Sequence, residues 1–259
     1  MFTFQWLDAV KSWLSGGRKR PALQAVQAAG GGSRHRKAGT LNPQAAINGA
    51  RVTVPAGAEI FDNEPVWLQW AEPGGGGDYR TDSRIPPSNE EQPTIDFLVP
   101  SEYIRWHIGK SLVVLYEVLE QGVVEPHKSV ELELQVSALP STAMHPVQSQ
   151  QISGNQLSLS ALGSGGALFS LAQWPLIATG QLLTVEIVGV ALAGGNLTIP
   201  VLTAQPVLQL LPLIPAGSIS KTSLRQFKVP SPLTIKAWVS FDGNQTRSPF
   251  RNLTPQLVA

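Results

Sequence analysis

The chain has 259 residues, no cysteine and a formal net charge of +1, from 19 Lys and Arg against 18 Asp and Glu. The missing cysteine excludes a disulfide scaffold, a Cys-ligated zinc site and a cysteine nucleophile. Charged residues make up 14% of the chain, against about 25% in an average soluble domain. No apolar run reaches the roughly 18 residues that a transmembrane helix needs.

The charge is unevenly distributed along the chain. Residues 1–40 hold seven basic residues and one acidic residue, a net charge of +6. The remaining 219 residues carry 12 basic and 17 acidic residues, a net charge of −5. The protein is therefore a basic arm on a mildly acidic body, and this balance argues against nucleic acid as a partner of the body.

Residues 1–15 predict a short amphipathic helix. Their apolar side chains recur at spacings of three and four, which gathers them on one stripe of a helix. Ser15, Gly16 and Gly17 then end it. Basic residues follow this apolar segment rather than precede it, so we expect no cleavable signal peptide.

An aromatic helix followed by basic residues can lie on an anionic membrane surface, dock into a partner's groove or fold back onto its own domain. We expect the arm to dock on a protein partner or an oligomeric assembly. The residues predicted to make this contact are Phe2, Phe4, Trp6, Val10, Trp13, Arg18, Lys19 and Arg20. Residues 16–44 predict a flexible Gly-rich and basic linker.

A period of two dominates from residue 45 onward. It is cleanest at residues 130–136, where four apolar residues alternate with three polar ones. Further strands are predicted at residues 51–54, 66–70, 95–99 and 111–119. Pro and Gly clusters separate these segments and no convincing helix lies between them, which predicts an antiparallel β-sandwich over residues 45–139.

Residues 140–150 have no hydrophobic period and predict a linker between domains. A second sandwich is predicted over residues 151–259, with alternation at 156–160, 183–187 and 233–241, the last ending at a hairpin signal, Asp242-Gly243. Residues 197–215 carry no charge, which fits either a buried edge strand or an exposed contact surface. The predicted fold is all-β: two tandem Ig-like antiparallel β-sandwich domains behind the helix and linker.

Trp67 and Trp238 are candidate ligand contacts. Trp67 lies three residues from Trp70, so the two face opposite sides of a regular strand and one of them lies outside the core unless it is covered. Trp238 alternates out of phase with the apolar residues of 233–241. An outward-facing Trp can stack on a glycan or contact a protein, and packing against a neighbouring module is the structural alternative.

No motif predicts catalysis. The four histidines lie in separate segments without metal-ligand spacing, and no Gly-x-Ser-x-Gly elbow occurs. We therefore expect no enzyme, no catalytic residue, no metal and no cofactor. The acidic, Gly-rich loop 72–92 leaves calcium binding open beside a solvated polar loop.

Five segments resemble a known family. Residues 99–104, 109–118 and 129–136, with 174–181 and 231–243 in the second unit, resemble bacterial Ig-like β-sandwich repeat proteins of the pseudomonad surface or secreted type. The resemblance implies a sandwich fold, an adhesive or structural role without catalytic residues, and an extracellular or cell-surface location on a Gram-negative bacterium.

Two functions follow as expectations. The first is a non-enzymatic structural or binding protein of tandem Ig-like modules, docked through its N-terminal arm, in surface attachment or assembly. The alternative is a subunit of a larger bacterial or phage-like particle whose N-terminal arm inserts into a neighbouring subunit. An anionic membrane surface or a glycan is the further partner that the arm and the outward-facing tryptophans suggest.

Overall fold

Short strands joined by turns make up most of the chain, which a computed structural model describes over residues 3–4, 37–54, 60, 63–86 and 95–259. The chain forms two compact units, residues 1–138 and 139–259. The prediction of an all-β fold built mainly from antiparallel sheets is confirmed, since strands hold 45% of the residues and helices 8%. Within the described ranges, none of the helices has the length and apolar character that crossing a membrane requires.

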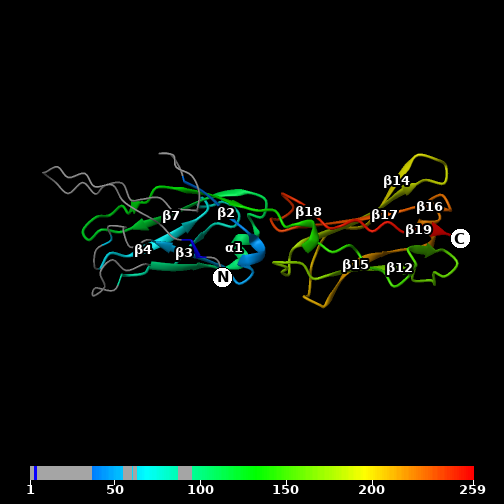
Figure 1. Cartoon of the computed structure of the whole chain (residues 1–259), viewed down its shortest axis with the longest axis horizontal. Helices are drawn as coiled ribbons and strands as arrows, with labels where there is room; N and C mark the ends of the chain where they lie inside the picture. Colours follow the sequence, from blue (N-terminus) through cyan, green and yellow to red (C-terminus); the bar gives the residue numbers. More distant parts are fainter. Residues whose placement is uncertain (1–2, 5–36, 55–59, 61–62, 87–94) are drawn as a thin grey trace. The chain divides into compact units, whose positions relative to one another are not determined.

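Two sheets form the first unit (Figure 1). The larger has the strand order β2-β9-β7-β4-β5, with β8 beside β7, and the smaller has the order β1-β3-β6. The elements are β1 (Thr3–Phe4), β2 (Lys37–Leu41), η1 (Pro43–Ala46), β3 (Ala50–Val54), β4 (Val66–Trp70), β5 (Tyr79–Arg80), β6 (Ile95–Val99), α1 (Ser101–Arg105), β7 (Ser111–Val118), β8 (His127–Lys128) and β9 (Leu132–Val136).

Alternation along the strands places one face of each sheet in the core. In β7, Leu112, Val114 and Tyr116 are buried, whereas the residues between them are half-exposed. Burial raises the pKa of the Tyr116 hydroxyl above its ordinary value, because the phenolate would lose its hydration. The opposite, outward face of the larger sheet therefore carries the odd-numbered residues of β7.

The first unit closes by pairing β2 with β9. The two strands run parallel through five residue pairs, from Lys37 opposite Leu132 to Leu41 opposite Val136. We expected residues 37–41 to belong to a flexible linker over 16–44. They instead form a strand because Gly39 and Leu41 alternate into the core, a pattern too short and too poor in β-branched residues to stand out in the sequence.

The start of the chain also differs from expectation. Thr3 and Phe4 form β1, which runs parallel to β3 with Thr3 opposite Arg51 and Phe4 opposite Val52. A helix was expected over residues 1–15. The order Phe2-Thr3-Phe4-Gln5-Trp6 also has the period of two that a strand requires, a signal that the helical spacing obscured. The other residues of the predicted helix, and the linker up to residue 36, lie outside the described residues.

The second unit contains three sheets. Their orders are β14-β13-β17-β18, β10-β11-β19-β16 and β12-β15. The elements are η2 (Ser141–Ala143), β10 (Ile152–Ser153), β11 (Gln156–Ser158), β12 (Ala167–Ala172), β13 (Leu182–Val190), β14 (Asn196–Pro206), β15 (Leu213–Ile219), α2 (Lys221–Leu224), β16 (Ser231–Pro232), β17 (Thr234–Ser240), β18 (Ser248–Pro249) and β19 (Gln256–Val258).

The central pair of the second unit is β13 and β17. Leu183 lies opposite Val239 and Ile187 lies opposite Ile235, and all four side chains are buried. An early strand again pairs in parallel with the last strand: β11 lies beside β19 from Gln156 opposite Gln256 to Ser158 opposite Val258. The two units therefore share the same kind of closure.

Residues 140–150, expected to link the domains, belong to the fold of the second unit. Met144 and Val147 are buried in its core. The backbone of Gln148 exchanges two hydrogen bonds with Ser170, of 2.8 and 2.9 Å. A segment without a regular hydrophobic period can still bury single apolar side chains. The sequence therefore did not reveal that Met144 and Val147 are buried.

A buried carboxylate holds the loop between β17 and β18. Asp242 is 0% exposed. Its oxygens accept hydrogen bonds from the backbone amides of Gln245 (3.1 Å) and Thr246 (2.9 Å), and from the hydroxyls of Thr246 (2.6 Å) and Ser240 (2.8 Å). The predicted hairpin forms here, with Trp238 opposite Pro249, and the carboxylate satisfies donors that the loop would otherwise bury unpaired.

Replacing this carboxylate should destabilise the second unit. We expect Asp242→Ala to lower the free energy of unfolding by about 2–3 kcal/mol, because buried amides lose their acceptor. Urea denaturation of the full chain followed by circular dichroism measures the loss. Glu186→Gln, at the other acidic residue of this unit, is the matched control and should stay within about 0.5 kcal/mol of the wild type. Equal unfolding free energies for both variants would contradict the role assigned to Asp242.

Candidate functional site

The predicted ligand contact Trp67 lies on the outward face of the larger sheet, next to Glu117 on the neighbouring strand β7. Its indole Nε1 donates a hydrogen bond to Glu117 Oε2. The Arg80 guanidinium lies over the indole ring, 4.2 Å from the ring centroid. Trp67 is therefore only 9% exposed, and stacking of a ligand on its face would require Arg80 to move away. Its partner Trp70 points the other way and is fully buried.

Glu117 organises the charges around Trp67. Its carboxylate also pairs with Arg80 at 3.0 Å and with Lys128 at 3.7 Å. Two cations and one indole N–H thus converge on a carboxylate whose side chain is 12% exposed. The two cations and the indole N–H together compensate a carboxylate that is largely withdrawn from water.

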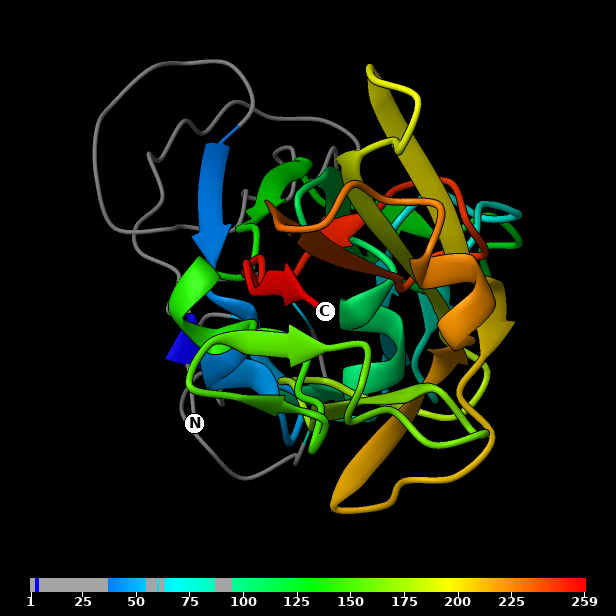
Figure 2. The ribbon, with the colours of Figure 1, turned by 90° about the vertical axis from the view of Figure 1, so that its right-hand side faces the viewer.

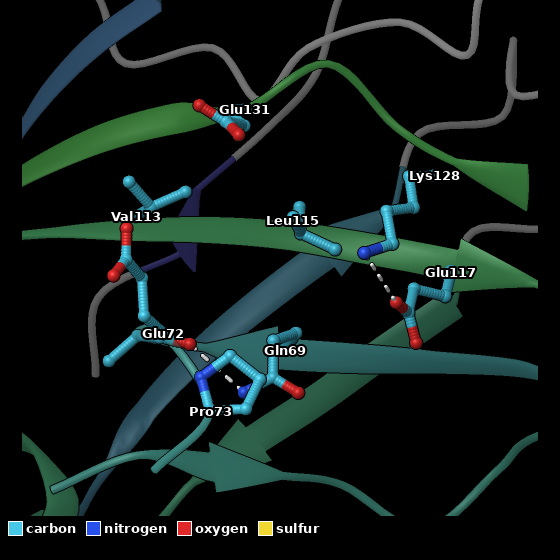
Figure 3. A pocket seen from close by; sticks show the side chains of 9 residues that line it. Gln69, Glu72, Pro73, Val113, Leu115, Glu117, Lys128 and Glu131 are labelled. Atoms are coloured by element: carbon cyan, nitrogen blue, oxygen red, sulfur yellow. Dashed lines mark hydrogen bonds and ion pairs between the residues drawn. The ribbon is translucent and has the colours of Figure 1, made fainter. Parts of the chain in front are cut away.

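A small pocket opens beside this cluster on the same face (Figure 3). Val113 and Leu115 of β7 form its apolar floor, and the side chains of Glu72, Glu117 and Lys128 lie around it. Its volume is about 170 Å³, less than the roughly 300–1,000 Å³ of typical small-molecule sites. The pocket can admit a small group or part of a side chain.

The Gly-rich loop after β4 packs on the segment that follows α1. A Cβ atom at Gly77 would lie 2.4 Å from Cβ of Trp106, and one at Gly76 would lie 2.8 Å from its ring. Gly77 also has φ of +78°. Glycine is required at Gly77 because the backbone approaches the tryptophan too closely for any side chain and adopts the left-handed conformation.

His107 also contacts the Gly-rich loop after β4. Its ring lies edge-on to Trp70, with centroids 6.4 Å apart, and its Nε2 lies 3.1 Å from the Gly77 carbonyl oxygen. Burial lowers the pKa of His107 below its ordinary value. The charge of Lys110 acts in the same direction, whereas the hydrogen bond to Gly77 acts against both. His107 is therefore a structural histidine that donates Nε2–H to the loop in its neutral form.

The acids of loop 72–92 are only partly described. Asp78 Oδ2 accepts a hydrogen bond of 3.0 Å from the Gly74 amide and so caps the glycine turn. Glu90 and Glu91 lie outside the described residues. Among the residues that the structure describes, no three His, Asp or Glu side chains gather where they could hold a metal ion.

The second predicted ligand contact, Trp238, lies on the outward face of β17. It is half-exposed and has Thr184 of β13 and Pro249 of β18 as its cross-strand neighbours. Trp67 belongs to the first unit and Trp238 to the second. The predicted docking residues of the arm lie outside the described residues, except for the backbone of Phe4.

An apolar surface in the second unit stands out more clearly than either tryptophan. No charged residue occurs from 187 through 220. Within that stretch, four leucines that follow β14 are exposed by 79, 49, 41 and 48%, and we call them the leucine surface: Leu208, Leu210, Leu211 and Leu213. Exposed apolar groups of this density mark contact sites for other proteins or apolar surfaces.

The chain beside the leucine surface is anchored. The buried Val207 exchanges backbone hydrogen bonds with Gly180 (2.9 Å) and Gln181 (2.8 Å), and the Gln173 amide donates to the Leu211 carbonyl at 3.0 Å. The preceding strand β14 is the edge of its sheet and has no buried residue. In Figure 2, its hairpin with β13, in yellow, stands away from the rest of the unit. The uncharged segment is thus both an edge strand and an exposed patch.

Comparisons with known proteins give no family. No family model matches the chain, and no curated protein matches it. Similar solved structures include a chain of a 1.5-MDa bacterial ice-binding adhesin (12% identity, TM-score 0.23), CBD12 from CALX1.2 (9%, 0.25) and a marsupial T cell receptor (12%, 0.24). They cover 85, 78 and 86% of this chain, which in turn covers 61, 79 and 95% of theirs.

The adhesin chain is longer than this protein, which spans 61% of it. At these identities and TM-scores the likenesses carry no argument about function. No sequence family supports the narrower pseudomonad type suggested by the strand motifs.

Removing the acceptor of the Trp67 indole should destabilise the first unit. We expect Glu117→Leu to lower the free energy of unfolding by about 1–3 kcal/mol, because a nearly buried N–H loses its acceptor. Glu117→Gln keeps an acceptor oxygen and loses only ion pairs with exposed cations, so about 0–1 kcal/mol is expected. Urea denaturation ranks the two variants, and equal losses would show that the indole hydrogen bond is not the main contribution.

His107 should make the stability of the first unit pH-dependent. Its folded pKa lies below the unfolded value of about 6.5, so below that pH the unfolded chain binds a proton that the folded chain excludes. This contribution to stability is intact above about pH 6.5 and is lost as the pH falls through the folded pKa. Between pH 7.5 and 5.5, the unfolding free energy should fall more in the wild type than in His107→Gln, which retains an N–H donor. Parallel curves would contradict this assignment.

Proposed function

We propose that this chain is a non-enzymatic binding protein built from two Ig-like β-sandwich modules and acting in surface attachment or assembly. The leucine surface is the observation that carries the proposal. It presents four leucines on a backbone that hydrogen bonds hold in place, within a stretch of 34 uncharged residues. A partner that covers these side chains would gain apolar burial without having to desolvate a charge.

The pocket and the Trp67 cluster fit a supporting role in this proposal. The charges of the cluster are already paired, because the Glu117 carboxylate accepts a hydrogen bond from Trp67 and forms ion pairs with Arg80 and Lys128. We further propose that the protein is displayed outside the cell or on the surface of a Gram-negative bacterium, with its N-terminal arm as the docking element. The arm's aromatic and basic residues suit a protein groove or an anionic surface.

The leucine surface can be tested on the producing cell. We expect the double variant Leu208→Ser, Leu211→Ser to lower the amount of epitope-tagged chain retained on washed cells at least fivefold. Leu168→Ser, an equally exposed leucine on β12 (59%), is the matched control and should be retained like the wild type. Circular dichroism verifies that both variants fold. Unchanged retention of the folded double variant would overturn the role of this surface.

A subunit of a larger particle is the second candidate function. The pairing of β1 with β3 favours it, because it joins the N-terminal arm to the edge of a sheet. The same contact made between copies would link subunits. Sedimentation velocity of the full chain distinguishes the two candidates: higher-order species that depend on residues 1–20 support a particle subunit, and a monomer at all concentrations contradicts it.

A further inference from the structure

β3 has β6 on one side and β1 on the other, and we call the side that pairs with β1 the acceptor side. β6 pairs with the other side of β3 along its whole length, from Ala50 opposite Val99 to Val54 opposite Ile95. On the acceptor side, the only pairing among the described residues is with β1, which covers Arg51 and Val52. Two of the five residues of β3 are thus engaged there. A sheet edge of this kind recognises an extended segment through its backbone groups.

Contacts that do not involve β1 hold the acceptor in place. On its outward face, Arg51 Nη1 pairs with Asp96 Oδ2 at 3.1 Å, and the Thr53 hydroxyl donates to Asp96 Oδ1. On its inward face, Val52 and Val54 are buried in the core. The edge is therefore preorganised, and an incoming strand would not bear the cost of ordering it.

The N-terminal sequence matches the acceptor residue by residue. In the observed register, Thr3 lies opposite Arg51 and Phe4 lies opposite Val52. The sequence of residues 2–6 alternates apolar and polar residues, and β3 alternates the buried Ala50, Val52 and Val54 with Arg51 and Thr53, so the two patterns match. Residues 1–6 carry no charged side chain that would oppose this pairing.

The chain between β1 and β2 is long enough to reach another molecule. Residues 5–36 separate the two strands, a stretch that could extend to roughly 100 Å at about 3.3 Å per residue. The pairing that the structure describes covers Thr3 and Phe4, and each backbone hydrogen bond is worth only about 0.5–1.5 kcal/mol net. The length of residues 5–36 would let this strand reach an identical edge on a neighbouring copy.

We propose that the side of β3 that pairs with β1 is the acceptor for residues 2–6 of a second copy of this chain, so that neighbouring copies exchange their N-terminal strands. This inference rests on the second candidate function, assembly through the arm, and names the surface and the segment that would carry it. Exchange replaces the pairing of β1 with its own β3 by the same kind of pairing between copies, so it costs little once copies are held close together.

Because the protein has no cysteine, introduced cysteines report on this contact directly. Thr3 and Arg51 lie opposite each other, and neighbouring strands are about 4.8 Å apart, within disulfide reach. Full-length Thr3→Cys and Arg51→Cys chains are mixed at about 100 µM in a glutathione redox buffer. We expect the mixed dimer to exceed the sum of the two symmetric dimers at least fivefold. Phe4→Pro added to the Thr3→Cys chain should remove the excess, because proline cannot donate to the sheet.

The matched control is Leu98→Cys, on β6 directly opposite Arg51 and 52% exposed. Mixed with Thr3→Cys, it should give only the random yield. If Thr3→Cys mixed with Arg51→Cys gives no more mixed dimer than Thr3→Cys mixed with Leu98→Cys, strand exchange is overturned. It is also overturned if the Thr3→Cys, Arg51→Cys double variant forms disulfides only within one chain. Sedimentation of the cysteine-free chain tests assembly separately, so particles that form without this cross-link would refute the inference and leave the second candidate function intact.

Discussion

In each unit an early strand lies parallel to the last strand of the unit, β2 beside β9 and β11 beside β19. These pairs join residues about a hundred positions apart in the sequence, so the intervening strands must be in place before the pairs can form. They tie both ends of the unit to the same sheet. The connection after β9 starts from this closure, since the Ser137 amide donates to the Leu41 carbonyl at 2.9 Å.

Sequence periodicity located the strands whose inward residues are large and apolar. Residues 66–70 and 95–99 were predicted with the bounds that the structure has. Alternation coincides with burial at 95–99, whereas all five residues of β4 are buried. β2 was missed because its inward residues are Gly39 and Leu41, one of which contributes no apolar signal. β1 was expected to be helical because Phe2, Trp6, Val10 and Trp13 follow a helical spacing, which obscured the alternation of residues 2–6.

The candidate sites were harder to predict than the strands, because the register between neighbouring strands decides which side chains meet. Trp67 lies on the outward face of its sheet but is only 9% exposed. The sequence could not show that Arg80 covers it, since that contact depends on the register of β4 with β5. The role of Asp242 was visible only as a turn signal. The leucine surface was visible as an uncharged stretch, but its exposure follows from the position of β14 at the edge of its sheet.

The parallel closure also determines how a unit responds to tension. β2 begins at Lys37 and β9 ends at Val136, at opposite ends of the parallel pair. A pull applied at Lys37 and at Val136 therefore acts along the strands and loads all five residue pairs in shear. The hydrogen bonds between them must fail together rather than one after another. Proteins are only marginally stable toward unfolding in solution. The parallel pair nevertheless resists a force applied along β2 and β9, because all of its hydrogen bonds must break at once.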